Sequence, residues 1–442
     1  MSEYDVIVIG GGISGLLSTL ALSKEGRKVL LIEKDSQLGG VCRSYSVDGY
    51  KVDTGPHIIT RLEHGPLKAL MDKYFELTPL FIPHGKYYVR LGKRVLPFPW
   101  NMSAWLTFDL LPPVDRIYLM KTLFTASYLF SSDQNLQKMS VGQLVGEGVS
   151  QETKHFLNCM CAFMTGGSSM YETPVSRFID SEHYKTMPEQ GIIDKLYSVL
   201  MKEGATDQTY PKKGIQTITD SIIASLPKDK VTVKTLEEAK RIEHEGSRKI
   251  VATNKDNYTA ETIVYTGFAR DLPELVKELP KEYSEKLGKI RHIRSLSLWL
   301  GLKKKVFDVQ GSEIWADGEP YSWVVSTSNY DPELAPKGKQ LVGFGFIMPK
   351  DTKPEDYRKK AIDHVYKTMP GLEKQVEMTH YQYLVPEKAV WTVTTEFADV
   401  KTPVEGLYLA GTDTTKKSMG ITRASYSVVR LLEELRKDRK IA

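Results

Sequence analysis

Cysteine is scarce in this sequence: its 442 residues include three, Cys42, Cys159 and Cys161. So small and odd a number excludes a disulfide framework, fits a reducing compartment and predicts a cytoplasmic protein. Cys159 and Cys161 lack the spacing of zinc ligands, and no cluster of histidines and cysteines accompanies them in the sequence. We therefore predict no metal site.

Long apolar runs and a strong excess of one charge are also missing. The chain has no run of about eighteen consecutive apolar residues, so it predicts no membrane-spanning helix. Its first apolar stretch, VIVIG, is short and follows no basic segment, unlike a signal peptide. The net charge of +5 is too small to indicate a nucleic-acid partner. The remaining expectation is a globular protein of ordinary composition, long enough for two domains.

The N-terminal segment predicts a strand, a turn, a helix and a second strand. DVIVI, residues 5–9, is apolar and β-branched almost throughout, as expected of a strand buried on both faces. ISGLLSTLALSK predicts a helix over residues 13–24, which Gly26 ends at a C′ position. KVLLIEK, residues 28–34, predicts a second buried strand. The glycines of the intervening turn have the spacing Gly-x-Gly-x-x-Gly.

This order is the fingerprint of a dinucleotide-binding βαβ unit. Its glycines permit a tight turn, close approach of a pyrophosphate, and close packing of helix against strand. The helix N-terminus offers free N–H groups to the anion. Glu33 is placed to accept hydrogen bonds from a ribose diol, which disfavours NADP and leaves FAD or NAD. The residues expected to contact the dinucleotide here are Gly10, Gly12, Ile13, Ser14, Gly15, Glu33 and Lys34.

A motif shortly after Glu33 favours FAD. LGGVCRS, residues 38–44, resembles the GG-x-x-R-[ST] element of the flavin amine oxidase superfamily, which includes monoamine and polyamine oxidases, protoporphyrinogen oxidases and phytoene desaturases. Val41 departs from the arginine that many members have there. The resemblance implies that Arg43 meets the FAD pyrophosphate, a role that suits a bidentate guanidinium. The residues assigned in this way are Gly39, Gly40, Arg43 and Ser44.

VDTGPHII, residues 52–59, resembles the [DE]-x-G segment of the same superfamily, in which the backbone runs beside the flavin ring. The resemblance assigns this place to Asp53, Gly55 and Pro56. His57 resembles the histidine of a similar Gly-x-His-Ile turn in UDP-galactopyranose mutases, and we consider it for both the cofactor site and the substrate pocket. A partly buried histidine in a turn is the alternative interpretation.

The C-terminal segment resembles the family's last strand–turn–helix, whose helix N-terminus faces the flavin. GLYLAGTD predicts the strand and turn, and MGITRASYS begins the helix. Arg423 and Tyr426 depart from the common pattern, and the segment has no cysteine, so we expect FAD to be bound non-covalently. The residues assigned by the resemblance are Gly411, Asp413, Gly420, Ile421 and Thr422.

A central segment resembles the family's return to the FAD domain. It predicts a helix over 214–226, a strand over 231–234 and a hairpin with Gly246 at its turn. The resemblance places a backbone contact with adenine near Glu238 and Ala239. An ordinary βαβ edge is the alternative interpretation.

The predicted fold class is therefore α/β, with a Rossmann-type FAD-binding domain assembled from three sequence segments and an inserted α+β substrate domain. The FAD segments are 1–85, 205–285 and 395–442. The inserts are 86–204, mainly helical, and 286–394, with the strands of a sheet that floors the pocket.

The middle of the chain contains the candidate substrate groups. Residues 96–130 combine Trp, Phe, Leu and Pro with basic residues, which suits a lid over an apolar pocket or a peripheral membrane contact. Helices packed on the core, with Trp100 and Trp105 buried, are the alternative. Trp391 is a candidate pocket aromatic, although a Trp at this place is also a common core residue.

No Ser/His/Asp set, metal cluster or catalytic carboxylate pair emerges, so the catalytic residues stay unassigned. A flavin accepts hydride without any of these groups. We expect FAD-dependent dehydrogenation of a small lipophilic substrate, of isoprenoid, carotenoid or porphyrinogen type, with oxygen or a quinone as electron acceptor. An amine oxidase that forms imine and hydrogen peroxide, a non-redox flavin enzyme of mutase type, and a flavin-bound assembly or redox-sensing module remain alternatives.

Overall fold

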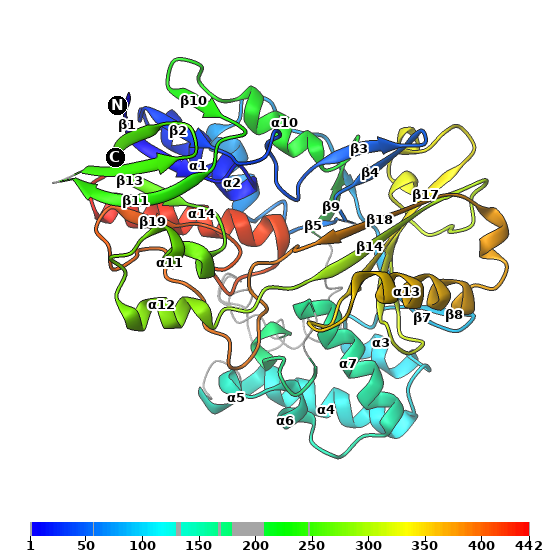
Figure 1. The fold of residues 1–442 in the computed structure, drawn as a ribbon. Helices are drawn as coiled ribbons and strands as arrows, with labels where there is room; N and C mark the ends of the chain where they lie inside the picture. The colour runs from blue at the N-terminus through cyan, green and yellow to red at the C-terminus, as the bar shows by residue number, and fades with distance from the viewer. Residues whose placement is uncertain are drawn as a thin grey trace.

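Two seven-stranded sheets organise the chain and lie on opposite sides of Figure 1. The computed structural model describes residues 2–55, 57–129, 134–166, 169–178, 207–245 and 248–441. Both parallel and antiparallel pairs occur, together with helices on the sheets. The predicted α/β class is confirmed.

The first sheet joins strands from three distant parts of the chain. Its order is β10 (Val231–Lys234), β2 (Val29–Ile32), β1 (Ser2–Ile9), β13 (Asn257–Tyr265), β12 (Arg248–Thr253) and β11 (Ala239–Glu245), with β19 (Leu407–Leu409) beside β13. The pairs β1–β2, β1–β13 and β13–β19 are parallel, so the carboxyl ends of these strands meet at one edge of the sheet. The predicted turn residue Gly246 lies outside the described residues.

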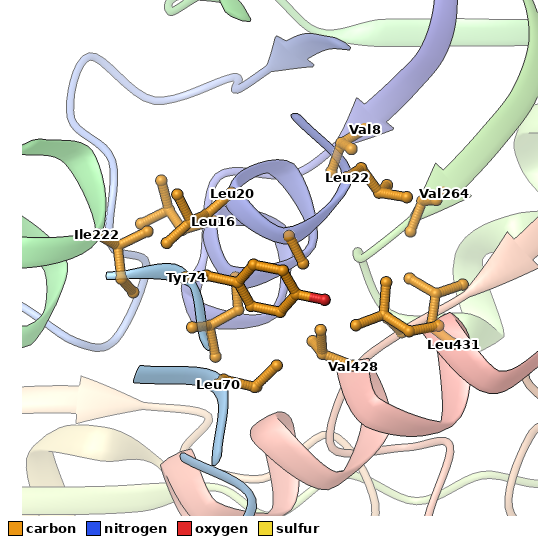
Figure 2. Close-up of a cluster of buried hydrophobic side chains, with 14 of the residues drawn as sticks. Val8, Leu16, Leu20, Leu22, Leu70, Tyr74, Ile222, Val264, Val428 and Leu431 are labelled. Carbon is orange, nitrogen blue, oxygen red and sulfur yellow. The ribbon is translucent and has the colours of Figure 1, made fainter. Parts of the chain in front are cut away.

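Strand β1 is buried on both faces because its side chains alternate between two cores. Val6 and Val8 belong to one apolar cluster, and Ile7 and Ile9 belong to the other. The first cluster packs under helices α1 (Ile13–Lys24), α2 (Pro66–Tyr74), α10 (Gln216–Ala224) and α14 (Gly420–Lys437). Figure 2 shows side chains from these four helices converging on Val8 and Val264 of the sheet. Helices α11 (Leu272–Leu275) and α12 (Lys281–Gly288) cover the second cluster.

The second sheet forms the other half of the molecule. Its order is β18 (Val376–Leu384), β14 (Ser295–Leu302), β17 (Gln340–Ile347), β16 (Ser322–Val325), β15 (Gly311–Trp315), β7 (Lys86–Leu91) and β8 (Arg94–Pro97). Leu296, Leu298 and Leu300 of β14 pack with α13 (Pro354–Thr368) in one cluster. The alternate residues Ser295 and Ser297 face a cavity on the other side.

The first insert differs in part from the mainly helical segment that we predicted. It begins with the hairpin β7–β8, whose first strand pairs in parallel with β15. In its described residues the helices that follow are α3 (Met102–Thr107), α4 (Pro113–Leu129), α5 (Gln134–Lys138), α6 (Val141–Val145) and α7 (Gln151–Thr165). They lie beneath the second sheet in Figure 1. The five predicted segment boundaries stay predictions.

Short elements complete the described fold. They are strands β3 (Ser44–Val47), β4 (Tyr50–Asp53), β5 (Ile59–Thr60), β6 (Phe81–Pro83) and β9 (Gln208–Pro211), and the 3₁₀ turns η1 (Val175–Arg177), η2 (Ala269–Asp271), η3 (Thr327–Asn329), η4 (Pro332–Leu334) and η5 (Leu372–Gln375). None of the helices in the described ranges has the length and apolar character needed to cross a bilayer.

Candidate functional site

The N-terminal glycine turn is closed in the way the fingerprint requires. Gly10 has φ +105°, and a Cβ on Gly15 would lie 1.9 Å from the Gly10 carbonyl oxygen. Helix α1 starts without a capping side chain or an acidic residue in its first turn. The amides of Ile13 and Ser14 donate to no acceptor among the described residues. This helix start therefore has the free N–H groups that fit a pyrophosphate.

Glu33 lies at the end of β2, facing the glycine turn, and is 8% exposed. Its Oε2 accepts a hydrogen bond from the Gly11 amide at 2.5 Å and its Oε1 accepts one from the Asp35 amide at 2.8 Å. Each carboxylate oxygen keeps a further lone pair, so the group fits a ribose diol. Lys34, which follows it, has an exposed side chain.

The segment after β10 lies against this acid. The Leu236 amide donates to the Asp35 carbonyl and the Glu237 amide donates to the Glu33 carbonyl, both at 3.0 Å. Ala239, the predicted adenine neighbour, follows at the start of β11 and is buried. Segments some two hundred residues apart in the sequence thus meet beside the candidate ribose site, and the adenine contact itself stays a prediction.

The second glycine motif packs directly on the first. The Gly39 amide donates to the Gly11 carbonyl at 2.8 Å, and a Cβ on Gly40 would lie 3.2 Å from the Gly12 Cα. Arg43 is anchored there because its Nε donates to the Gly40 carbonyl at 2.7 Å. This anchor holds the guanidinium beside the glycine turn, which fits the predicted pyrophosphate contact.

Asp53 is buried, does not line the cavity, and connects three parts of the chain through its carboxylate. Its carboxylate accepts hydrogen bonds from the Ser44 hydroxyl at 2.6 Å, the Tyr210 hydroxyl at 2.7 Å and the Ile215 amide at 3.1 Å. Burial raises the pKa of Asp53, and the bonds from Ser44 and Tyr210 oppose that rise. Asp53 and Ser44 therefore connect the two predicted cofactor segments that contain them, residues 38–44 and 52–59, to the central segment at Tyr210 and Ile215.

The turn after Asp53 lies where the two halves of the molecule meet. Gly55 has φ +81°, and a Cβ there would lie 3.2 Å from both Leu384 and Ser297 of the second sheet. Its amide donates to Gln382 Oε1 of β18 at 2.8 Å. Pro56 lies outside the described residues.

His57 is held in one tautomer. Its Nδ1 lies 2.7 Å from the Gly55 carbonyl oxygen, which can only accept, so Nδ1 carries the hydrogen and Nε2 is left as an acceptor. Burial lowers the pKa of His57, although Asp53 opposes this effect. The imidazole is therefore neutral and lines the cavity.

The C-terminal turn has its predicted residues close to the first glycine motif. The Ser427 hydroxyl accepts from the Gly411 amide at 3.0 Å, and Asp413 Oδ2 accepts from the Ala269 amide at 2.7 Å. Helix α14 begins at Gly420, and within the described ranges the amides of Ile421 and Thr422 donate to no acceptor. These free N–H groups again fit an anionic or carbonyl-rich group.

Two charged residues of the segment before this turn were missed by the sequence analysis. Lys388 is partly buried, and its Nζ donates to the Gly267 carbonyl at 2.9 Å and also to the Thr266 carbonyl. Burial lowers the pKa of Lys388 and raises that of Asp413, and each charge opposes the shift of the other. The charges of Lys388 and Asp413 therefore stabilise each other beside the glycine turn.

Glu387 forms a buried ion pair with Arg423. Arg423 Nη1 lies 3.0 Å from Glu387 Oε2, and the side chains are 1% and 3% exposed. The guanidinium also donates to the carbonyls of Ser418 and Ala389, each at 2.9 Å, and Glu387 accepts from the Gly420 amide. The pair therefore fixes the start of α14. The adjacent charges within the apolar stretch VPEKAVW are the sequence feature that could have revealed Glu387 and Lys388.

A cavity of 1580 Å³ connects this region with the second sheet. Gly55, His57 and Gly420 line it on the cofactor side, and Phe163 and Trp323 line it on the substrate side. Gly10, Glu33 and Arg43 are not part of its lining.

Trp391 is not brought to this cavity, although the neighbouring Val390 lines it. Its ring packs on the core of the first sheet, with the Arg177 guanidinium 5.7 Å from the ring centre. The core alternative for Trp391 therefore fits the described residues better than a pocket role.

Comparison with known proteins identifies a family for most of the chain. A family model described as flavin-containing amine oxidoreductase matches residues 13–425. An uncharacterised protein from the nifH2 3′ region of Methanothermococcus thermolithotrophicus is 51% identical over 102 residues, which are 23% of this chain and 98% of that protein. Human all-trans-retinol 13,14-reductase is 38% identical over 75 residues, and the match covers 17% of this chain and 12% of the reductase.

Solved structures agree on the fold. An oxidoreductase from Methanosarcina mazei superposes with a TM-score of 0.80 at 19% sequence identity, covering 97% of this chain and all of the other. At this identity the similarity extends to the fold alone.

Proposed function

The chain belongs to the family of flavin-containing amine oxidoreductases and is an FAD-dependent oxidoreductase, and from this premise we propose that it dehydrogenates a lipophilic small molecule of isoprenoid, carotenoid or porphyrinogen type. When bound, FAD supplies the chemistry of hydride acceptance. The observation that carries the proposal is the large cavity that reaches Gly55, His57 and Gly420. The relative named for all-trans-retinol supports a substrate of the isoprenoid class.

The walls of the cavity suit an extended apolar molecule. Ile314, Trp323 and Ile347 of the second sheet face it together with Phe163 of α7. Its volume of 1580 Å³ exceeds the roughly 300–1,000 Å³ of ordinary small-ligand sites. Because Gly55 and Gly420 of the candidate cofactor site line the same cavity, we infer that its volume is shared by the flavin ring and an apolar substrate.

His57 is the group that we propose to receive the substrate proton. Dehydrogenation of a C–C bond removes one hydride and one proton. The neutral imidazole has its Nδ1–H fixed on the Gly55 carbonyl, so Nε2 is the available acceptor. The low pKa that burial gives His57 keeps this acceptor unprotonated at neutral pH.

An absorbance experiment on purified protein tests the central proposal. We expect flavin bands from non-covalent FAD and their anaerobic bleaching by a lipophilic polyene or porphyrinogen. Slow reoxidation in air would indicate a quinone-type acceptor, and rapid reoxidation would indicate oxygen. A colourless protein that cannot be reconstituted with FAD would contradict the proposal.

Amine oxidation is the second candidate, because the family model is named for it. An aromatic cage for an amine requires two rings with a slot between them. Phe163 and Trp323 line the cavity as a pair, but their ring centres are 6.0 Å apart and tilted by 57°, so they contact each other. Flavin bleaching by a panel of primary and secondary amines, with stoichiometric peroxide, would favour this candidate over the first.

We also propose that the helical insert contacts a membrane peripherally. Trp105 is buried and Trp100 lines the cavity, so packing accounts for both tryptophans. The exposed apolar residues are instead Leu106, Val114 and Ile117 of α3 and α4, which are 59%, 76% and 64% exposed.

Flotation with phospholipid vesicles tests this contact. Replacement of Leu106, Val114 and Ile117 by glutamine should abolish flotation and leave the flavin spectrum unchanged. Equal flotation of the wild type and the triple variant would remove the membrane proposal. The matched control is a triple variant at Leu77, Leu80 and Leu236, which are similarly exposed but lie outside the insert.

A further inference from the structure

One end of the cavity is lined by more basic than acidic groups. Residues 289–294 link α12 to β14 and run between the two halves of the molecule in Figure 1. Arg291 and Arg294 of this link line the cavity, together with Arg270 from η2 and Lys350 from the turn after β17. We call these four residues the basic mouth. They come from separate elements that the fold brings together.

Direct contacts link Arg294 to Lys350 and Arg270 to the neighbouring His292. Arg270 Nη1 lies 3.2 Å from His292 Nδ1, and Arg294 Nη1 donates to the Lys350 carbonyl at 2.7 Å. The pKa of His292 is lowered by burial, and the charges of Arg270 and Arg294 lower it further. These effects favour the neutral form of His292, which contacts Arg270 directly.

The acidic groups nearby do not balance these charges. Asp271 lies 3.7 Å from Arg270, and Glu172 lies 3.4 Å from Arg291. Arg294 and Lys350 have no acidic partner within the ranges that the structure describes. Among the described residues, Asp271 and Glu172 are thus the carboxylates paired with these four cations, and both ion pairs are exposed enough to be weak.

Apolar side chains begin immediately inside the basic mouth. Ile293 lies between His292 and Arg294 in sequence, lines the cavity and is 4% exposed. Met348, two residues before Lys350, also lines it and is 4% exposed. The cavity is thus amphipathic, because its lining combines these four cations with apolar side chains and also includes His57.

We propose that the substrate is an amphipathic anion whose carboxylate or phosphate head binds Arg294 and Lys350, while its apolar body reaches toward His57. This inference rests on the proposed function and specifies its substrate class. Guanidinium groups recognise both head types through charge-assisted, bidentate hydrogen bonds. The same charges repel a protonated amine at the entrance, which favours the first candidate function over amine oxidation.

Binding of matched probes to the FAD-loaded protein tests the inference. The probes are dodecanoate, dodecyl phosphate, dodecanol and dodecylamine, each below its micellar concentration, followed by calorimetry and by perturbation of the flavin spectrum. The two anions should bind at least about tenfold more tightly than the alcohol, and the amine should bind least. The tighter of the two anions identifies the head group. Raising the salt concentration should reduce the anion preference.

The double variant Arg294→Gln/Lys350→Gln should reduce anion binding to the level of the alcohol and leave alcohol binding unchanged. The matched control is Lys304→Gln/Lys337→Gln, which also removes two cations but at exposed positions outside the cavity lining. Equal binding of all four probes, or an anion preference that survives in the double variant, would overturn the inference. The inference would also be overturned if the double variant no longer bound vesicles of anionic phospholipid but still bound dodecanoate.

Different results would refute the proposed dehydrogenase activity and the proposed anionic substrate. If the protein binds FAD and oxidises neutral lipophilic molecules without preferring anions, the anionic head group of the substrate is refuted. The proposed dehydrogenase activity is not affected by that result. Protein that never acquires FAD would refute the dehydrogenase directly, whichever probe binds to it.

Discussion

Replacing Arg423 by methionine is expected to destabilise the protein and loosen the start of α14. The change removes the 3.0 Å contact between Arg423 Nη1 and Glu387 Oε2, and the bonds to the Ser418 and Ala389 carbonyls. Methionine retains apolar volume, so the main loss is the cation that compensates a carboxylate only 3% exposed. Breaking one side of such a buried pair costs about 3–5 kcal/mol.

The corresponding change in melting temperature follows from the chain length. An unfolding entropy of about 2.1 cal/mol/K per residue, over 442 residues, gives about 0.9 kcal/mol for each kelvin. The expected fall in Tm is therefore about 3–5 °C, measured by differential scanning fluorimetry. The fall in Tm should be larger for FAD-loaded protein than for protein without FAD, because Glu387 also accepts a hydrogen bond from the Gly420 amide at the candidate cofactor site.

The pH dependence gives an independent test of the same mechanism. Burial already raises the pKa of Glu387, and Arg423 opposes that rise. Without Arg423 the pKa of Glu387 in the folded state rises further. In the pH window between its unfolded-state pKa and this raised pKa, Glu387 is protonated in the folded variant and ionised in the unfolded chain. Stability of the variant should therefore fall as the pH rises through this window, and its deficit should shrink toward acid.

Two comparisons control for unspecific damage. Glu387→Gln in the Arg423→Met background should recover part of the lost stability, since it removes the stranded charge. Arg241→Met, at an arginine that is 58% exposed, should have little effect. The reasoning is refuted if Arg423→Met melts within about 1 °C of the wild type at neutral pH.

Three further changes and one assay test the remaining site assignments. Glu33→Gln should weaken FAD binding roughly tenfold to a hundredfold in a flavin fluorescence titration, because a neutral acceptor replaces a charged one; unchanged affinity would exclude the ribose contact. Gly15→Ala places a Cβ 1.9 Å from the Gly10 carbonyl oxygen, so the purified variant should have lost its flavin absorbance, and full retention would contradict the turn geometry. Lys388→Met leaves Asp413 without its cation and should cost about 1–3 kcal/mol of stability, whereas an unaltered melting curve would show that Asp413 does not need it. Acid precipitation should release all the flavin into the supernatant, and yellow pellets would disprove non-covalent binding.

Local sequence patterns were sufficient for the dinucleotide-binding unit. The predicted helix over 13–24 coincides with α1, and Gly26 follows it with φ +89°. The predicted strand over 231–234 coincides with β10. These features depend on apolar periodicity, glycine conformation and helix ends, each of which operates within a few residues.

The sequence by itself therefore determined the fold class, the family and the cofactor, since glycine spacing and one acid specify a local backbone shape that fits a dinucleotide. The tertiary structure alone decided the pairing of Glu387 with Arg423, the place of β7 beside β15, and the core position of Trp391. It also decided that Arg270, Arg291, Arg294 and Lys350 line the same cavity. These are contacts between residues far apart in the chain, and their energies depend on burial and distance in three dimensions, which no local pattern of residues encodes.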